Sequence, residues 1–494
     1  MAYAGLDVGT SGCKIVVYDA MGKVIFQAAE GYREYGEDGY REIDPEEVRE
    51  KVFQVLKAAG EGCPEKISAM AAASLGESIV CLDENGRSLC RSMVTGDRRG
   101  GDECAELIRE MGSERIMEIT GLPASEMYGL PKYIWMNRNT DVIRKAAHIF
   151  FYEDYVGYLL TGKRMVSDSS ASRSMAFDIH RREWDRELLG LAGMTPEQMS
   201  RPRPAGTVIG TVTEAMAQEL CLPAEMKVVV GGHDQSCAAL GSGLDDPHVG
   251  ECGMGTCEFM FLMLPDMGEP RYMIDHDFTC VPYVLGNRYL TSLEVTTCGV
   301  LKNWCRDTIL GGIARECEER GENFFAHMEE RLRGLSTEVL VLPQFGSSGN
   351  PDINCNVSGT VTGLTIHTKP EEIYLAVLEG MAFQMKLSYD LVRKLGVDIG
   401  QMICTGGGAR SDVTLQMRAD IFGMEVTTVQ SEETGTLGCM LLAAVADGVY
   451  GSMEEAVRRV VKTAKVFRPD ASKRDYYRRK YEKYKTLYET MHLF

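Results

Sequence analysis

A short run of polar residues, His233 to Gln235, stands where an α/β protein could use it for chemistry. It follows the apolar residues Val228–Val230 and two glycines, and small residues from Ser236 to Leu240 come next. The pattern predicts a buried strand that the glycines break, a turn that holds the polar residues, and the start of a helix. Such a turn lies at the C-terminal end of a strand, where α/β proteins bind their ligands. The Asp234 carboxylate could there accept a proton from a substrate hydroxyl, although an aspartate in this place more often caps the helix.

A glycine turn near the N-terminus is the second place that could do chemistry. Gly9 to Gly12 join two predicted strands, Tyr3–Val8 and Cys13–Tyr18, and a third strand is predicted at Val24–Ala29. Backbone N–H groups in such a turn can approach phosphate oxygens because glycine has no Cβ, and the Asp7 carboxylate beside them suits a hydrated Mg²⁺. An ordinary hairpin is the alternative interpretation. The sequence contains no G-x-x-x-x-G-K-[ST] motif, which excludes a Walker-type phosphate loop.

Two loops carry polar groups that could bind the hydroxyls of a sugar. The strand predicted at Lys66–Ala73 ends in a loop that contains Glu77, and a later loop contains Asp97 and Arg99. Charges in loops are usually only solvated, so the loops alone do not decide between binding and solubility.

The second half of the chain opens with an echo of the first. Gly253–Cys257, followed by the apolar residues Phe259–Met263, is similar to the segment Asp7–Ser11 and its following strand. The echo predicts two related domains, each beginning with a strand, a Gly-Thr turn and a second strand. Two such turns facing each other across a cleft would hold a nucleoside triphosphate. Met402–Arg410 is predicted to be a buried strand that ends in three glycines, which would admit an adenine ring or a ribose, or would serve only as a tight turn.

Much of the remaining pattern is helical. Helices are predicted over Glu46–Ala59, through Glu103–Thr161 and from Pro370 onward, and a hydroxyl-rich loop is predicted at Ser167–Arg173. The tail, Arg474–Phe494, has lysines and arginines that would also suit RNA, but its tyrosines recur at a spacing typical of a core-facing helical stripe. We therefore expect a closing helix that packs on the second domain. The tyrosines of this stripe are Tyr477, Tyr481, Tyr484 and Tyr488.

Length and composition exclude several classes of protein. The chain has 494 residues, enough for two to four domains, and a net charge of −19, which argues against nucleic acid or an anionic membrane as the main partner. No apolar run approaches the roughly 18 residues that span a bilayer, and no basic-then-apolar leader precedes the first strand. The 16 cysteines include no Cys-x-x-Cys pair and are expected to be reduced, mostly buried thiols. We expect a cytoplasmic protein.

Taken together, these motifs resemble the FGGY family of carbohydrate kinases over nearly the whole chain. Several matches in the family's order over two halves are a stronger signal than any one of them. The Gly359–Glu379 block is similar to one of the family's two signature regions. The other matching stretches are Gly5–Lys14, Asp38–Pro45, Lys132–Trp135 with Asn139, Ser167–Arg173, Gly231–Gln235, Met254–Cys257, Thr405–Ser411 and Glu433–Cys439.

The resemblance implies an α/β fold of two actin-like, ribonuclease H-like ATPase domains with a cleft between them. Residues 1–245 would bind the sugar and supply the catalytic base, and residues 246–494 would bind the nucleotide. ATP and Mg²⁺ are the implied cofactors, with Asp234 as the general base and Asp7 on the metal side. The implied nucleotide-binding residues are Gly9, Thr10, Ser11, Lys14, Gly255, Thr256, Gly407, Gly408 and Ala409, and the implied substrate-binding residues are Glu77, Asp97, Arg99, Asp234 and Gln235.

The departures from the family pattern concern the acceptor. Xylulokinase-like members carry a Gln-Met-His-Gly run where this chain has Leu75–Ser78, so a carboxylate, Glu77, replaces the histidine expected to contact a ketopentose. Thr95 stands where relatives place an aromatic residue. The leading hypothesis is phosphorylation of a terminal hydroxyl of a small ketose, as in a xylulokinase, in carbohydrate catabolism. The alternatives are a kinase for a polyol such as glycerol or erythritol, or a non-metabolic ATPase of the actin/Hsp70 type. A homodimer is considered, and the sequence leaves the oligomeric state open.

Overall fold

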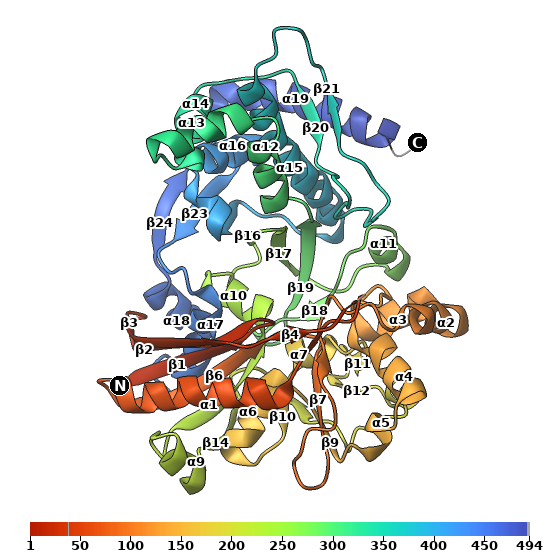
Figure 1. The fold of residues 1–494 in the computed structure, drawn as a ribbon, viewed down its shortest axis with the longest axis vertical. Coiled ribbons are helices and arrows are strands. Elements are labelled where there is room, and N and C mark those ends of the chain that lie inside the picture. The colour runs from red at the N-terminus through yellow and green to blue at the C-terminus, as the bar shows by residue number, and fades with distance from the viewer. Residues whose placement is uncertain (38, 492–494) are drawn as a thin grey trace. The chain divides into compact units, whose positions relative to one another are not determined.

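The computed structural model describes residues 1–37 and 39–491 and divides them into two compact units. The first unit contains Met1–Asp245 together with two later segments, Thr279–Leu290 and Glu433–Lys462. The second unit contains the rest, including the C-terminal helix (Figure 1). The chain leaves the first unit after Asp245, at the expected boundary, but it returns to that unit twice later, so the units are not two continuous halves. Asp38 of the motif Asp38–Pro45 and the last three residues of the predicted tail helix lie outside the described residues.

A six-stranded sheet with the order β14-β15-β6-β1-β2-β3 forms the centre of the first unit. The predicted opening meander is confirmed, since β1, β2 and β3 pair antiparallel in sequence order. On its other edge β1 pairs parallel with β6, and β6 pairs parallel with β15, so these three strands end at the same side of the sheet. The strands are β1 (Ala2–Val8), β2 (Gly12–Asp19), β3 (Val24–Gly31), β6 (Ile67–Ser74), β14 (Val208–Thr211) and β15 (Lys227–His233).

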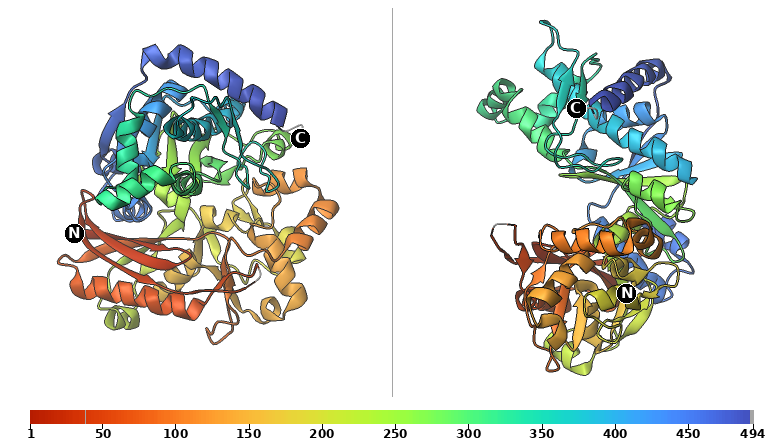
Figure 2. Two further views of the ribbon diagram at one scale, coloured as in Figure 1. Left: turned by 45° about the horizontal axis from the view of Figure 1, so that its top comes forward. Right: turned by 90° about the vertical axis from the view of Figure 1, so that its right-hand side faces the viewer.

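Two helices far apart in sequence pack against this sheet. Helix α1 (Pro45–Gly62) runs along β2 and β3 (Figures 1 and 2). Asp44 caps its first turn, and its valines and Leu56 are buried. Helix α17 (Thr434–Ala446) packs on β1 and β6 and crosses α10 (Asp234–Gly241) closely. Its middle is buried on every side, which explains why these residues belong to the first unit.

The other elements of the first unit are short. In the small sheets β5 pairs with both β4 and β8, β7 with β9, β10 with β13, and β11 with β12. Their strands are β4 (Glu34–Tyr35), β5 (Glu42–Ile43), β7 (Ile79–Leu82), β8 (Ser92–Met93), β9 (His148–Phe151), β10 (Met165–Ser167), β11 (Phe177–Asp178), β12 (Glu183–Trp184) and β13 (Arg201–Arg203); β18 (Val281–Pro282) also lies in this unit. The remaining helices are α2 (Gly101–Met111), α3 (Ser113–Thr120), α4 (Gly129–Asn139), α5 (Val142–Lys145), α6 (Tyr152–Thr161), α7 (Asp168–Ser172), α8 (Arg186–Leu191), α9 (Glu214–Glu219) and α18 (Met453–Val460).

Three local predictions for this unit were wrong. The stretch predicted as continuous helix contains strand β9, whose apolar residues pair antiparallel with β7; a short apolar run has no periodicity that distinguishes strand from helix. The predicted loop Ser167–Arg173 contains the short helix α7, because Ser167 accepts a hydrogen bond from the Ser170 N–H and caps it. Strand β15 continues through both glycines to His233, so Asp234 is already the first residue of α10.

The second unit repeats the first unit's central arrangement. Strands β16 and β17 form an antiparallel hairpin, and β16 pairs parallel with β22, as β1 does with β2 and β6. The sheet continues to β23 and β24 on one side and to β19 on the other. The strands are β16 (Val249–Met254), β17 (Glu258–Leu264), β19 (Tyr289–Val295), β22 (Gln401–Thr405), β23 (Glu425–Val429) and β24 (Thr463–Phe467), and a separate pair joins β20 (Leu340–Leu342) to β21 (Thr360–Thr362).

The predicted helices of the second unit are present. Pro370 begins the long α15, and Ser411 caps α16 by accepting the Thr414 N–H. The tyrosine stripe of α19 faces inward, since Tyr481, Tyr484 and Tyr488 are buried. The helices are α11 (Pro270–Asp275), α12 (Gly299–Asp307), α13 (Gly311–Arg320), α14 (Phe324–Leu332), α15 (Pro370–Val392), α16 (Asp412–Phe422) and α19 (Arg474–Met491), with 3-10 turns at Arg393–Leu395, Gly407–Arg410 and Ala471–Lys473.

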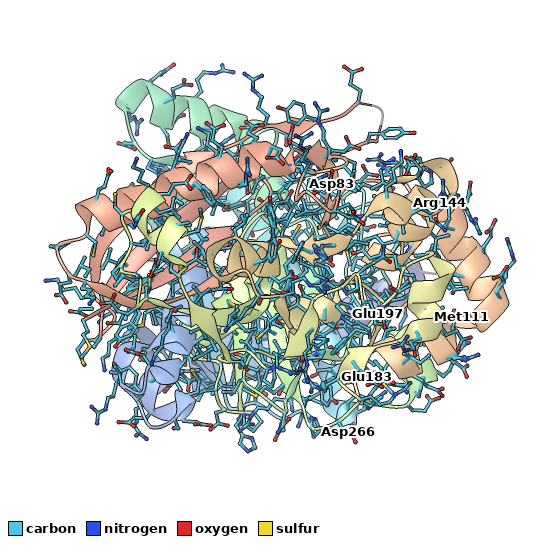
Figure 3. All side chains as sticks on the ribbon, turned by 90° about the horizontal axis from the view of Figure 1, so that it is seen from below. Asp83, Met111, Arg144, Glu183, Glu197 and Asp266 are labelled. Atoms are coloured by element: carbon cyan, nitrogen blue, oxygen red, sulfur yellow. The ribbon has the colours of Figure 1, made fainter. Side chains whose placement is uncertain are left out.

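Charged side chains lie on the surface and the cysteines are reduced thiols, as the composition predicts. Charged side chains such as Arg144, Glu183 and Glu197 stand exposed on the first unit (Figure 3). None of the 16 cysteines forms a disulfide, and most are buried, as expected. Across residues 1–37 and 39–491, no helix combines the length and the apolar character that a membrane crossing requires.

The crossing of α10 and α17 allows a direct test of the fold. A Cβ at Gly438 would lie 1.9 Å from the carbonyl oxygen of Cys237 on α10, whereas a Cβ at Gly435 would meet nothing within 4 Å. Gly438→Ala should therefore destabilise the protein by about 3 kcal/mol, since backbone atoms cannot move aside as a flexible side chain can. Gly435→Ala on the same helix is the matched control and should cost nothing. Equal melting temperatures for the two variants in thermal unfolding would contradict this packing.

Candidate active site

Asp234 lies at the carboxyl end of β15, where the sheet register brings three strands together. His233 pairs with Ser74 of β6, and Asp7 of β1 pairs with Ala73 one residue earlier. The Asp234 Oδ1 accepts the N–H of Gln235 at 2.6 Å, and the His233 Nε2 lies 3.0 Å from the same oxygen. The side chain keeps 32% of its surface exposed. A carboxyl held on one side and open on the other can reach a ligand.

The surroundings of Asp234 change its proton affinity. Burial raises the pKa of Asp234 to about 7, and the negative charge of Asp7 adds to the shift. Burial and the Arg173 charge lower the pKa of His233 to about 3, so the ring is neutral near pH 7. The contact between the two side chains is therefore one between a neutral imidazole and a carboxyl group. A carboxyl with a pKa close to the working pH is suited to accept and release a proton.

Asp7 and the glycine turn form the adjacent part of the site. Lys14 lies opposite Asp7 in the β1–β2 register, and its Nζ donates to Glu433 Oε1 at 2.8 Å. Burial raises the pKa of Asp7 to about 6, opposed by Lys14 and reinforced by Glu433. Oδ1 of Asp7 is buried and has no hydrogen-bond partner among the described residues. An unpaired carboxylate oxygen beside a glycine turn fits a hydrated divalent cation.

The turn between β1 and β2 is held in place by backbone bonds and one tyrosine. The Gly9 N–H donates to the Gly12 carbonyl at 2.9 Å, and the Tyr32 N–H donates to the Ser11 carbonyl at 3.1 Å. The Tyr32 hydroxyl contacts the carbonyl oxygens of both Gly9 and Gly12. The predicted segment Gly9-Thr10-Ser11 is thus a fixed turn beside Asp7.

Glu77 occupies the loop after β6 and is paired. It is buried, and the Arg173 guanidinium donates to its Oε1 while the Thr95 hydroxyl donates to Oε2 at 2.8 Å. Burial alone would raise the pKa of Glu77, but the Arg173 charge and the neighbouring polar groups together outweigh burial, and the pKa lies below its usual value. The guanidinium carbon of Arg173 stands 4.8 Å from the centre of the Tyr128 ring. Glu77 is therefore an ionised carboxylate in a polar corner next to His233 and Asp234.

The structure brings Asp97 and Arg99 together but pairs neither with Glu77. Both carboxylate oxygens of Asp97 accept from the Arg99 guanidinium, at 2.8 and 2.6 Å, and the Arg41 N–H donates to Oδ2 at 2.8 Å. Arg99 also donates to Glu42 at 2.6 Å. These bonds fix the loop against the β4–β5 hairpin. Gln235, the last predicted substrate-binding residue, is exposed.

The predicted nucleotide residues of the second unit lie at the ends of two paired strands. Gly255 and Thr256 close the β16–β17 hairpin, where the Gly255 N–H donates to the Cys257 carbonyl at 3.0 Å and Thr256 accepts from the Gly299 N–H at 2.8 Å. The segment Gly407–Ala409 follows β22 in a 3-10 turn that packs on the end of β16, since a Cβ at Gly408 would lie 2.8 Å from that of Met254. The glycines therefore allow a close approach of backbone at this edge.

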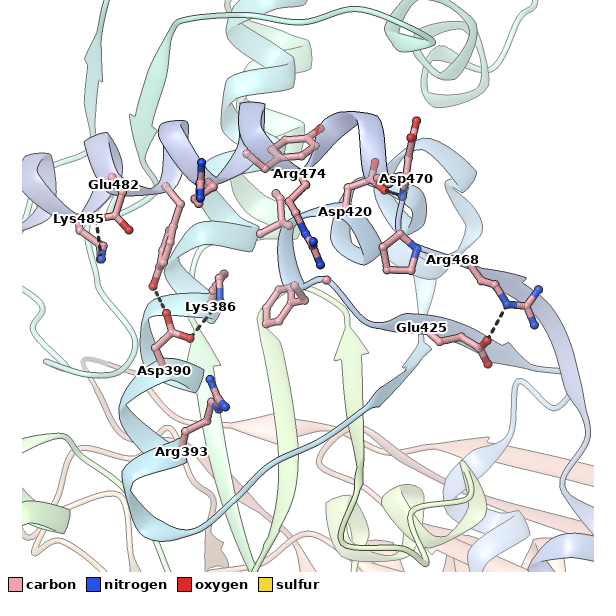
Figure 4. A pocket seen from close by; sticks show the side chains of 18 residues that line it. Lys386, Asp390, Arg393, Asp420, Glu425, Arg468, Asp470, Arg474, Glu482 and Lys485 are labelled. Atoms are coloured by element: carbon pink, nitrogen blue, oxygen red, sulfur yellow. Dashed lines mark hydrogen bonds and ion pairs between the residues drawn. The ribbon is translucent and has the colours of Figure 1, made fainter.

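A separate groove of about 970 Å³ lies on the second unit between α15, α16 and α19 (Figure 4). Its charges are largely paired in place, as Figure 4 shows for Lys386 with Asp390 and Arg468 with Glu425. It contains none of the predicted site residues.

Sequence reasoning missed several residues of the first unit's site. Arg173 and Glu433 lie inside quoted motifs, but their partners, Glu77 and Lys14, are distant in the chain. Lys132 is buried and its Nζ donates to the carbonyls of Val94, Thr95 and Met127. Lys132 stands among apolar residues in the first part of α4, and a basic residue in such a run is a signal that could have identified it. For Arg173 the sequence gives no such signal.

Comparison with known proteins identifies the family. Residues 2–241 match the N-terminal domain and residues 250–446 the C-terminal domain of the FGGY family of carbohydrate kinases. The chain is 25% identical to a xylulose kinase of Staphylococcus epidermidis over 497 residues, covering 98% of this chain and 96% of that protein. It is 26% identical to a gluconokinase of Bacillus subtilis over 459 residues, covering 91% and 88%. A xylulose kinase structure from Rhodospirillum rubrum superposes with a TM-score of 0.89 at 24% identity, covering 100% and 99% of the two chains.

These matches agree with the architecture, in which each unit carries the same hairpin and parallel strand around its glycine turn. They confirm the expected actin-like α/β fold and exclude a non-metabolic ATPase of the actin/Hsp70 type as the chain's family. The chain belongs to the FGGY family of carbohydrate kinases and is a phosphotransferase that acts on an alcohol group.

Proposed function

We propose that this kinase transfers the γ-phosphoryl group of ATP to a terminal hydroxyl of a small ketose, with Asp234 as the general base. The observation that carries the proposal is the Asp234 carboxyl itself. It begins α10, stays one-third exposed and has a pKa of about 7. Such a group can take the proton from a hydroxyl as the oxygen attacks phosphorus.

Phosphoryl transfer depends mainly on position and on neutralising charge, and the first unit offers groups for both. The backbone of Gly9–Ser11 would face the transferred phosphate, and Lys14, held by Glu433, would add a positive charge nearby. Asp7, whose Oδ1 lacks a partner among the described residues, would hold Mg²⁺. When bound, Mg²⁺ neutralises charge on the phosphate oxygens. Gly255, Thr256 and the segment Gly407–Ala409 would bind the rest of the nucleotide.

Two observations bear on the acceptor, namely the names of the relatives and the presence of Glu77. The relatives named xylulose kinase, which match nearly the whole chain, support a ketose. Glu77 supports a polyol such as glycerol as the second candidate, because it stands where xylulokinase-like members carry the histidine expected to contact a ketopentose. Asp97 and Arg99 remain proposed acceptor residues, and their mutual ion pair points to a supporting part in which they fix the loop beside Glu77.

The proposal is tested with purified protein, ATP, Mg²⁺ and a panel of ketoses and polyols, with ADP release as the readout. We expect xylulose or a close relative to stimulate ADP release strongly over the rate without acceptor. If no acceptor does so at millimolar concentration, the proposed acceptor class is wrong.

Removal of the base should abolish transfer with little effect on the nucleotide. Asp234→Ala and Asp234→Asn should each lower kcat by roughly 10²–10⁴-fold, the usual contribution of a general base. The affinity for ATP, measured by fluorescence or calorimetry, should change less than about twofold, because Asp234 contacts the acceptor side. Turnover equal to that of the unmodified protein would contradict the assignment.

The rate should depend on pH through the ionisation of Asp234. Only the carboxylate accepts a proton, and a pKa of about 7 means that the active form is lost as the pH falls through that value. We expect log kcat/KM for the acceptor to fall with a slope near one below about pH 7. The groups that set this limb are Asp7, Glu77, Arg173 and His233. A profile that stays flat down to pH 5 would show that the base ionises normally or is another residue.

A further inference from the structure

Arg173 is fixed by contacts on several sides. Its guanidinium donates to Glu77 and stands over the Tyr128 ring at 4.8 Å. A Cβ at Gly76 would lie 2.9 Å from the Arg173 Nε and 3.1 Å from the His233 ring, so both side chains press against one backbone position. Arg173 therefore has one defined place beside His233 and Asp234.

The charge of this corner is negative. Glu77, Asp7 and Asp234 supply carboxyl groups, and the cations among them already have partners. Arg173 is paired with Glu77, and Lys14 is paired with Glu433. The Nζ of the third cation, Lys132, donates to three backbone carbonyls in the protein interior. The carboxylate of a charged acceptor would be repelled by these acids. None of the three cations is available to neutralise it, so binding would cost free energy.

The same corner suits hydroxyl groups. Glu77 keeps only 1% of its side-chain surface exposed, whereas Arg173 keeps 15%, so Arg173 is the member of the pair that an acceptor hydroxyl can reach. A hydroxyl oxygen can accept from the guanidinium without bringing a charge of its own, so the ion pair stays balanced when a neutral acceptor binds.

We propose, resting on the proposed function, that the Glu77–Arg173 pair selects uncharged polyhydroxy acceptors and rejects aldonates, with Arg173 as a specificity-determining residue. Glu77 cancels the charge that would otherwise attract a carboxylate. An acceptor of the gluconate type is thereby excluded although a relative of similar identity is named a gluconokinase.

The first experiment compares xylulose, glycerol and gluconate with the unmodified protein. Acceptor binding is measured by calorimetry and transfer by ADP release. We expect kcat/KM, or affinity, to favour the better neutral acceptor over gluconate by at least about 100-fold. Gluconate bound or phosphorylated as well as either neutral compound would overturn the proposal. If no compound is phosphorylated, the proposed function has failed, and the calorimetric preference still decides this inference.

The second experiment changes the pair itself. Glu77→Gln keeps the shape but leaves the Arg173 charge uncancelled, so the preference for the neutral acceptor should fall at least about tenfold through improved use of gluconate. The double variant Glu77→Gln/Arg173→Met should lose that gain. Arg182→Met is the matched control, because Arg182 pairs with Asp168 at 3.3 Å and stands over Tyr289, and it should leave the preference unchanged.

Three results of the second experiment would contradict the proposal. One is an unchanged preference in a folded Glu77→Gln variant, and another is a gain that survives removal of Arg173. The third is an equal gain in the Arg182→Met control. If Glu77→Gln does not fold, Arg173→Lys replaces it: lysine keeps the charge but lacks the fork, so KM for the neutral acceptor should rise at least about tenfold while gluconate stays poor. Unchanged kinetics in that variant would count against Arg173.

Discussion

The parallel pairing of β1, β6 and β15 is the constraint on which the first unit's site depends. Parallel strands end at the same side of a sheet, and here their ends carry Asp7, the Glu77 loop and Asp234. Burial is the main reason why the pKa values of Asp7 and Asp234 are raised, and repulsion adds to it, from Glu433 on Asp7 and from Asp7 on Asp234. Arg173 and Lys14 reduce the repulsion among these acids, because they form ion pairs with Glu77 and Glu433. The chemistry proposed for the kinase uses the raised pKa of Asp234 that remains.

The two units build the same hairpin from different residues. In the first, a carboxylate, Asp7, stands just before the glycine turn, and the turn is tied down by Tyr32. In the second, the matching position is Gly253, and the nearby buried acid, Glu251, accepts a hydrogen bond from Thr405 at 2.7 Å. Burial raises the pKa of Glu251 to about 7. The same backbone frame thus presents a carboxylate in one unit and mainly backbone in the other, which fits a division between catalysis and nucleotide binding.

Local patterns were sufficient to predict the framework but not the contacts. The hairpin around Gly9–Gly12, helix α1 and the inward tyrosines of α19 all follow from periodicity and turn chemistry. The strand β9 could not be predicted, because four apolar residues fit a helix or a strand and only the pairing with β7 decides. Arg173 reaches Glu77 from 96 residues away, a contact that depends on how α7 packs and that no local signal encodes. For the same reason the sequence could not predict that the Asp97 carboxylate is held by Arg99 and the Arg41 N–H.

The place of α17 in the first unit also bears on how the protein is made. The Tyr18 hydroxyl bonds to Thr436 across 418 residues of chain, and Gly5 of β1 lies directly under the Thr436 carbonyl. The face of β1 and β6 that α17 covers therefore stays uncovered during synthesis until α17, hundreds of residues later in the chain, has been translated. Contacts of such large sequence separation form slowly, because the closure of a long loop precedes any gain from packing. The sheet of the first unit is thus translated well before the helix that completes it, and an apolar sheet face left uncovered in that interval is a site where chains can aggregate.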